Sequence, residues 1–219
     1  MMTLKLFFAG LFLIDLVLHA GWPIWPLLGL SILAMALILE RLWFLRTSHV
    51  APPEAIEPVL LQCQTTLPTQ QQTLELSKSS LLGTLLALGI ERVRSQPLIS
   101  DASLRQTLEL EGRLTCAKLE KHLPTLATVA SVATLMGLLG TVIGMIDIFA
   151  AQSQMGQQPA QLAQGISMAL YNTAFGLVVS IPSLLAWRWL RSRADHHIMQ
   201  LEVACERLIH QLQQLQRQR

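Results

Sequence analysis

The chain has 219 residues, of which 52% are hydrophobic and only 14% are charged, and its mean hydropathy is +0.45. Soluble globular domains carry about 25% charged residues, so this composition excludes an ordinary soluble domain and indicates a membrane protein. The sequence contains no phosphate-binding glycine loop, zincin pattern or nucleophile elbow. We therefore expect no enzyme activity, no cofactor and no metal site.

The first stretch, residues 1–21, can be interpreted in three ways. A cleaved signal peptide is disfavoured because Asp15 interrupts the apolar run and residues 18–20 make a poor small-residue cleavage site. A fourth span is disfavoured because the run is short and carries a charge. We expect a helix that lies on the outer leaflet, with Asp15 and His19 on one face.

Three stretches are long and apolar enough to cross a bilayer. Their uncharged windows are residues 22–39, 126–146 and 165–187. Each is close to the roughly 20 residues that a helix needs to cross a hydrocarbon core of ~30 Å, and a helix pairs its backbone groups within its own segment. We therefore place transmembrane helices at residues 22–45, 124–147 and 165–187.

The basic residues predict the orientation of these helices. If the N-terminus is periplasmic, every one of the 16 Lys and Arg residues except Lys5 lies on the cytoplasmic side, as the positive-inside rule requires. Residues 148–164 then form a periplasmic loop, and residues 46–123 and 188–219 are cytoplasmic. Basic residues that mark sidedness in this way do not indicate a nucleic-acid partner.

The cytoplasmic segments carry helical signals. Residues 69–73 are polar and suggest a loop after Pro68, whereas residues 80–94 have helical apolar spacing. Ser100 is expected to cap a helix that continues into the second span, where Pro124 kinks it. Apolar residues three and four positions apart make a packing seam near the C-terminus: Ile198, Leu201, Cys205, Leu208, Leu212 and Leu215.

The predicted fold is therefore all-α, a polytopic membrane protein whose helices extend into a cytoplasmic helical bundle. Three cysteines, Cys63, Cys116 and Cys205, all fall in the cytoplasmic part. Because that compartment is reducing, we expect free thiols rather than disulfides. The pair His196-His197 has no further residues at metal-ligand spacing.

The second and third spans are rich in small residues, which let helix backbones approach one another closely in a membrane. We assign a packing role to Gly137, Gly140, Gly144, Gly165, Ala169 and Gly176. Hydroxyl side chains also line both spans, and in many helices such groups only bond back to their own backbone. Asn172 is costlier to place in lipid, so we expect it to face a pore or a partner.

Two motifs in these spans resemble the signatures of a known family. Residues 137–145 (GLLGTVIGM) resemble the second-span signature of ExbB, TolQ and MotA-type proton channels. Residues 165–182 (GISMALYNTAFGLVVSIP) resemble their third-span signature, and residues 22–41 fit the first span. MotA has four spans, so the three-span ExbB/TolQ branch is the more similar.

This resemblance implies an inner-membrane proton-channel (stator) subunit. It implies a homopentamer around a single-span ExbD/TolR-type partner that carries an intramembrane aspartate. The assembly would use the proton motive force to energise a TonB- or TolA-like protein that acts on outer-membrane transport. Thr141 and Thr173 match family threonines that line the pore opposite the partner's acid.

Two positions depart from the family pattern. Met168 stands where ExbB and TolQ usually have glutamate, and Arg188 replaces an asparagine that often follows the third span. A non-conducting scaffold of the same fold is therefore the alternative function. We also include Asp147 in the proton path, because it lies at nearly the depth of Met168 if Thr141 and Thr173 share a level. The competing interpretation is that Asp147 only ends the span in interfacial water.

Overall fold

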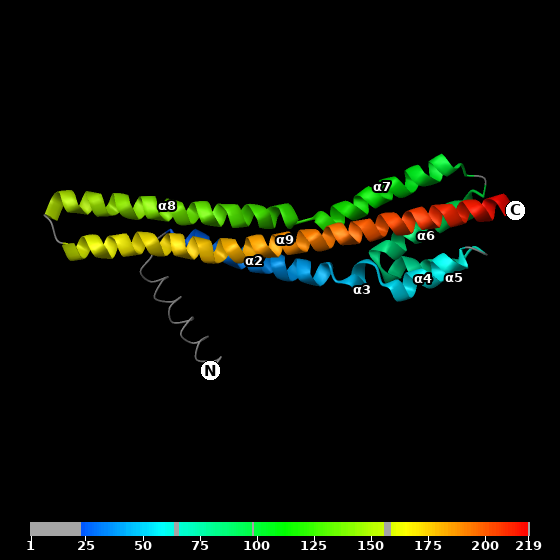
Figure 1. Ribbon diagram of the computed structural model, residues 1–219, viewed down its shortest axis with the longest axis horizontal. Coiled ribbons are helices and arrows are strands. Elements are labelled where there is room, and N and C mark those ends of the chain that lie inside the picture. The colour runs from blue at the N-terminus through cyan, green and yellow to red at the C-terminus, as the bar shows by residue number, and fades with distance from the viewer. Residues whose placement is uncertain (1–22, 64–65, 98, 156–158, 219) are drawn as a thin grey trace, which may run out of the picture. The chain divides into compact units, whose positions relative to one another are not determined.

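A computed structural model describes residues 23–63, 66–97, 99–155 and 159–218 (Figure 1). The surface helix expected at residues 1–21 lies outside these ranges. The described chain contains helices, turns and loops and no strand. It forms two compact units: unit 1 is Met1–Leu39 with Pro124–Arg188, and unit 2 is Glu40–Leu123 with Trp189–Arg219.

Unit 1 is built from three helices: α2 (Ile24–Phe44), α8 (Leu123–Met155) and the first half of α9 (Pro159–Gln218). By length and composition, the stretches Ile24–Phe44, Asp101–Ala150 and Gly165–Gln216 each contain a window able to cross a membrane. The expectation of an all-α protein with three apolar spans is therefore confirmed. The periplasmic loop is expected at residues 148–164. Residues 148–155 belong to α8 and residues 159–164 to α9, so only residues 156–158 fall between the two helices.

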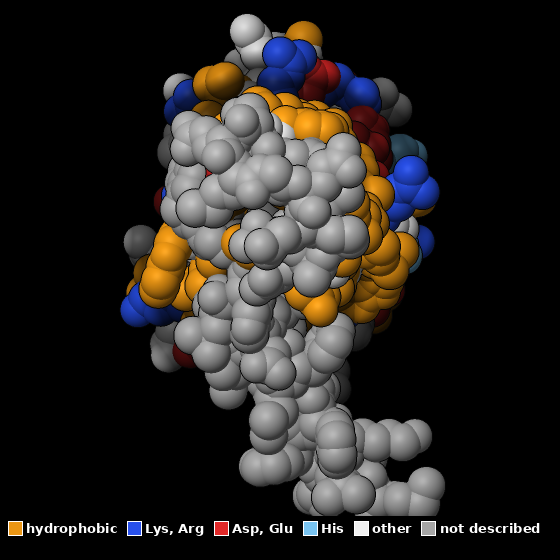
Figure 2. All heavy atoms as spheres, turned by 90° about the vertical axis from the view of Figure 1, so that its left-hand side faces the viewer, with side chains coloured by type: hydrophobic (Ala, Val, Ile, Leu, Met, Phe, Trp, Pro, Cys, Tyr) orange, Lys and Arg blue, Asp and Glu red, His pale blue; other side chains and the backbone are white. Residues whose placement is uncertain are grey.

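A small apolar core holds the three helices of unit 1 together. Ile24 and Leu27 of α2 pack with Ala133 of α8 and with Phe175 and Val179 of α9. Outside this core, large apolar side chains of all three helices are exposed, as in membrane helices that face lipid or further helices. Figure 2 shows hydrophobic side chains along the flanks of the molecule.

Unit 2 packs several shorter helices around the second half of α9. They are α3 (Thr47–Val50), α4 (Pro53–Gln62), α5 (Gln70–Ser79), α6 (Leu81–Ser95) and α7 (Asp101–Glu120). Leucines of α6 and α7 meet Leu201, Leu208 and Leu212 of α9 in one apolar core. The predicted seam of the C-terminal segment is thus the side of α9 that faces this core.

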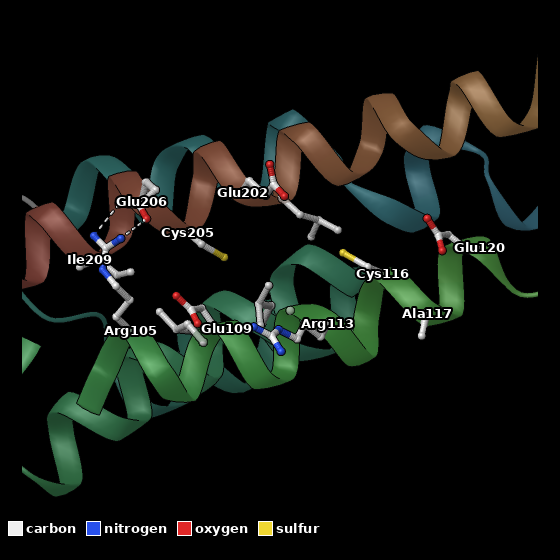
Figure 3. Close-up of a pocket in the computed structure, with 14 residues that line it drawn as sticks. Arg105, Glu109, Arg113, Cys116, Ala117, Glu120, Glu202, Cys205, Glu206 and Ile209 are labelled. Carbon is white, nitrogen blue, oxygen red and sulfur yellow. Dashed lines mark hydrogen bonds and ion pairs between the residues drawn. The ribbon is translucent and has the colours of Figure 1, made fainter. Parts of the chain in front are cut away.

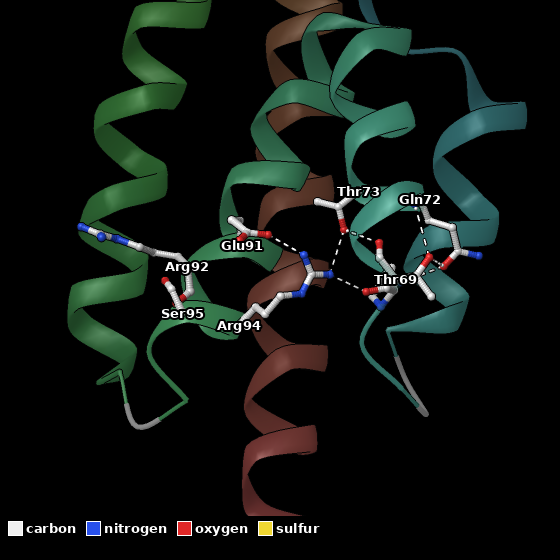
Figure 4. A network of polar contacts seen from close by, with 8 residues as sticks. Thr69, Gln72, Thr73, Glu91, Arg92, Arg94 and Ser95 are labelled. Atoms are coloured by element: carbon white, nitrogen blue, oxygen red, sulfur yellow. Dashed lines mark hydrogen bonds and ion pairs between the residues drawn. The ribbon is translucent and has the colours of Figure 1, made fainter.

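The prediction of a loop at residues 69–73 is wrong, because these residues begin α5. Thr69 is the N-cap: its hydroxyl accepts from the backbone N–H of Gln72, whose side chain accepts from the backbone N–H of Thr69 at 2.8 Å. This reciprocal pair is a capping box, in which two otherwise unpaired donors are satisfied. Arg94 of α6 then fixes this turn by donating to Pro68 O and Thr73 Oγ1 (Figure 4).

The predicted N-cap Ser100 is confirmed, since its hydroxyl accepts from the backbone N–H of Ser103. The prediction that this helix continues into the second span is wrong. It ends at Glu120, and α8 begins at Leu123, so Pro124 lies in the first turn of α8, where a missing N–H costs nothing. His122 has a φ of 65°, a left-handed conformation that interrupts a helix.

Two helix C-termini in unit 2 are capped by buried side chains from other helices. Arg41 of α2 is 2% exposed and donates to the carbonyl oxygens of Lys118 (3.2 Å) and Leu119 (3.5 Å) at the end of α7. His197 of α9 lies with Nε2 3.1 Å from Leu45 O, just beyond the end of α2. Cations and N–H donors are favourable there because terminal carbonyls have no partner within their own helix.

The three cysteines are free, as predicted. Cys63 is buried at the C-terminal end of α4, and burial raises the pKa of its thiol to about 11. Cys116 and Cys205 line a groove between α7 and α9 (Figure 3). Salt bridges from Arg105 to Glu206 cross this groove. Among the described residues, no group of His, Cys, Asp and Glu is arranged to hold a metal ion.

Candidate functional site: the α8 and α9 pair

The backbones of α8 and α9 touch at two glycines. A Cβ added to Gly176 of α9 would lie 2.8 Å from the carbonyl oxygen of Ala133 and 2.9 Å from the Cα of Gly137. A Cβ added to Gly137 would lie 3.0 Å from the carbonyl oxygen of Asn172 and 3.1 Å from the Cα of Gly176. Because backbone cannot move aside like a flexible side chain, only glycine permits this spacing at either position.

Further contacts continue this pair toward the loop that joins the two helices. A Cβ on Gly140 would lie 2.6 Å from Cβ of Asn172, and one on Gly144 would lie 3.0 Å from Cβ of Ala169. A Cβ on Gly165 would meet the side chain of Ile148. All six residues to which the sequence assigned a packing role therefore lie at the α8–α9 contact: Gly137, Gly140, Gly144, Gly165, Ala169 and Gly176.

These contacts define the register of the antiparallel pair. Position 137 faces 176, position 144 faces 169, and position 148 faces 165. The same register puts Thr141 and Thr173 at one level. It puts Asp147 close to the level of Met168, since two residues of helix rise only about 3 Å.

The hydroxyl groups of the two spans divide into two sets. Most bond back to their own helix, as Thr128 does to Pro124 O and Ser131 to Ala127 O. Others reach across: Thr173 Oγ1 donates to Gly137 O at 3.2 Å, and Thr134 Oγ1 lies 2.7 Å from Ser180 Oγ as well as 3.3 Å from Ala130 O in its own helix. The hydroxyl of Thr173 therefore does not bond back to its own helix but joins α9 to α8 at their closest approach.

Thr141 and Asn172 occupy different surroundings. The hydroxyl of Thr141 donates to Leu138 O in its own helix at 2.6 Å, and the side chain is half-buried. Asn172 is 3% exposed and packs over Gly140. Asn172 thus lies inside the α8–α9 pair, whereas Thr141 lies at its edge.

Asp147 is exposed on α8, and Met168 is half-buried on α9. No Asp, Glu, Lys, Arg or His occurs in residues 126–146 or 165–187. The paired spans thus offer hydroxyls, an amide and Tyr171, but no carboxylate, imidazole, amine or guanidinium group.

The sequence shows hydroxyl side chains along both spans but does not pair Thr134 with Ser180. Their bond depends on helix register, and a run of hydroxyls at helical spacing is the only available signal. Arg41 is only the last residue of the stretch, 22–41, that fits the first span of the family. Its basic charge in the last turn of α2 gave no indication that it caps α7, which is distant in sequence.

Comparisons with known proteins match this region and much of unit 2. A model of the MotA/TolQ/ExbB proton channel family matches residues 77–203. The chain is 30% identical over 184 residues to an ExbB-like biopolymer transport protein of Synechocystis, covering 82% of this chain and 71% of the relative.

Two other relatives match shorter parts. TolQ of the Tol-Pal system of Pseudomonas aeruginosa is 34% identical over 109 residues, covering 48% of this chain and 47% of the relative. The biopolymer transport protein ExbB of Aquifex aeolicus is 33% identical over 136 residues, covering 58% of this chain and 88% of the relative.

The glycine contacts predict a position-specific cost of adding a methyl group. Gly176→Ala forces its Cβ against backbone and should destabilise the protein by about 1–3 kcal/mol, the usual cost of overpacking. Gly29→Ala is the matched control, because nothing lies within 4 Å of a Cβ there. Thermal unfolding of the purified protein in detergent measures both. Equal midpoints for the two variants would contradict the close approach of α8 and α9.

Proposed function

Because the chain belongs to the MotA/TolQ/ExbB proton channel family, we propose that it is the proton-channel subunit of an ExbB/TolQ-type motor. The protein is a multi-pass membrane protein with three spans, and its family is one of transport proteins rather than enzymes. In the proposed motor, proton flow along α8 and α9 drives a TonB- or TolA-like protein that acts on outer-membrane transport.

The observation that carries this proposal is the α8–α9 pair itself. Its helix–helix contacts, between residues 133–148 and 165–180, lie within the matched family region, and they combine tight glycine packing with hydroxyls at one level. Exposed Thr128, Ser131 and Ser167 add polar groups to otherwise apolar flanks. A water-filled path needs such groups, because isolated polar side chains are expensive to expose to lipid.

The missing acid points to a partner. A proton relay through the membrane normally uses Asp, Glu or His, and these are absent from residues 126–146 and 165–187. We propose that a single-span ExbD/TolR-type protein supplies an intramembrane aspartate. Several copies of this chain, a pentamer by family analogy, would surround it with the α8 and α9 flanks.

We further propose a periplasmic N-terminus and a cytoplasmic C-terminus in the bacterial inner membrane. This orientation keeps all Lys and Arg residues except Lys5 on the cytoplasmic side. Unit 2, which contains the three free cysteines, would then lie in the reducing cytoplasm.

The first test is proton flux in liposomes with a pH-sensitive dye. The protein reconstituted alone should be silent, because residues 126–146 and 165–187 contain no Asp, Glu or His. Co-reconstitution with a single-span partner that carries the aspartate should produce flux, and Asp→Asn in that partner should abolish it. Proton flux without a partner would contradict the proposal that the partner supplies the acid.

The same assay distinguishes channel from scaffold. Met168 occupies a position at which the family usually has glutamate, and this departure favours the scaffold as the second candidate. A scaffold would bind the partner, measured by co-purification, yet remain silent in the flux assay. Flux from the purified pair would exclude the scaffold.

Thr141 and Thr173 are expected to act through their hydroxyls. Thr141→Val and Thr173→Val keep the side-chain volume and remove that group, so partner-dependent flux should fall while assembly with the partner persists. Thr→Ser at each position keeps the hydroxyl and should retain flux. The Thr173→Val protein also loses its bond to Gly137 O, worth about 0.5–1.5 kcal/mol, so its thermal midpoint must be compared with that of Thr173→Ser. If both Val variants conduct normally, these sites are wrongly assigned.

Asp147 is proposed to replace in part the carboxylate that Met168 lacks, because the two positions lie at similar levels. Asp147→Asn keeps size and polarity and removes the charge, so it should reduce flux. Adding Met168→Glu to that variant should restore flux. Unchanged flux in Asp147→Asn would leave Asp147 with an interfacial role only.

A further inference from the structure

Unit 2 carries two exposed apolar features on different helices. On α7, Leu110 and Leu114 are 62% and 51% exposed and lie one turn apart. On α9, Met199 and Val203 are 59% and 47% exposed and also lie one turn apart. Each feature leaves large side chains in solvent, although unit 2 has a well-formed core to receive such residues.

The α9 feature borders a groove between α4 and α9, which we call the α4–α9 groove. It has a volume of about 310 Å³ and a floor made by Ile56, Leu60, Leu82 and Ala204. An apolar cavity of about 150 Å³ accepts a benzene molecule, and a leucine side chain has fewer carbons. The groove is therefore large enough for two leucine side chains.

The two features lie on opposite flanks of the α7–α9 pair. Residues of α9 that face α7 include Cys205 and Glu206, whereas Met199, Val203 and Arg207 line the α4–α9 groove. Met199, Val203 and Arg207 lie about 120–160° around α9 from Cys205, whereas Glu206 lies closer to them. On α7, Leu110 and Leu114 are likewise absent from the groove that faces α9. Leu110 and Leu114 therefore do not reach the α4–α9 groove of their own copy.

The heights of the two features match. Salt bridges join Arg105 to Glu206 at 2.8 Å and Glu120 to Arg191 at 3.0 Å, so α7 and α9 run antiparallel in a known register. Counting the same number of residues along each helix from these salt bridges, in opposite directions, puts Leu110 opposite Leu201 and Leu114 opposite His197. Both heights fall within the α9 stretch that lines the α4–α9 groove.

We propose that Leu110 and Leu114 of one copy insert into the α4–α9 groove of the next copy. In this arrangement the copies are related by rotation about an axis parallel to α9 of unit 2, so residues at equal height along α9 meet. Each copy then offers a different surface on each flank, and such a heterologous contact makes a ring when the rotation between copies closes. The proposal rests on the multi-copy assembly proposed above and not on proton conduction.

Charge at the rim agrees with this arrangement. Glu111, between the two leucines, has no ion-pair partner among the described residues, and its height falls at Gln200. The rim there carries His196 and Arg207, and neither has an ion-pair partner in the described part of the chain. The rim also carries Glu57, so the contact is dominated by apolar burial and only assisted by charge.

Disulfide cross-linking of the full-length protein in native membranes tests the contact. Leu110→Cys is combined with Val203→Cys, and separately Leu114→Cys with Met199→Cys, in a background in which Cys116 and Cys205 are replaced by alanine. Cys63 stays, since it is buried. Mild oxidation should give a ladder of covalent multimers from each double variant and none from the single variants. The control pair Leu74→Cys with Val203→Cys uses an exposed leucine of α5 and should give none.

Other outcomes overturn the proposal. Cross-linked dimers from Leu110→Cys alone would mean an isologous contact. A bridge that forms only within one chain would mean that the two features meet inside a single copy. Native mass spectrometry of the same samples separates the remaining cases: a multimeric mass without cross-links refutes this interface alone, whereas a monomeric mass refutes the assembly as well.

Discussion

The contact of the α8 and α9 backbones at Gly137 and Gly176 is the constraint on which unit 1 depends. Lipid provides no hydrophobic force between apolar helices, so association relies on packing and on hydrogen bonds between helices. Because Gly137 and Gly176 have no side chains, the helices can pack closely and also form a hydrogen bond between them. At this spacing Thr173 Oγ1 lies 3.2 Å from Gly137 O. The same contact establishes the register in which Thr141 and Thr173 share a level.

In unit 2 the main constraint is different: helices end inside a packed bundle, where their last carbonyl groups need hydrogen-bond donors. The C-terminal carbonyls of α7 are capped by the buried guanidinium of Arg41, and Leu45 O, after α2, by His197. Each cap comes from another helix, so helix ends and tertiary packing stabilise one another. A buried arginine is costly unless its donors are paired, and carbonyls without a helical partner are available to pair them.

The absence of Asp, Glu, Lys, Arg and His from residues 126–146 and 165–187 has a functional consequence in the proposed channel. A charged residue in the membrane interior is expensive in every state of the protein. A chain that holds only hydroxyls and an amide there can fold and insert without that cost. Conduction would begin only when a partner introduces the acid, so a solitary subunit would not leak protons across the membrane.

The sequence by itself determined the composition, the three apolar windows, the small-residue motifs and the N-cap at Ser100. Each is a local property: length, hydropathy and spacing along one helix are sufficient to recognise it. The sequence misjudged residues 69–73, because a polar run suits both a loop and the capped first turn of a helix. It also missed the break at residues 121–122, since Pro124 suggested only a kink and no glycine marks the left-handed conformation of His122. Only the tertiary structure decided which hydroxyls cross between helices and which carbonyls Arg41 and His197 cap, because those contacts depend on the register and rotation of helices that meet far apart in sequence.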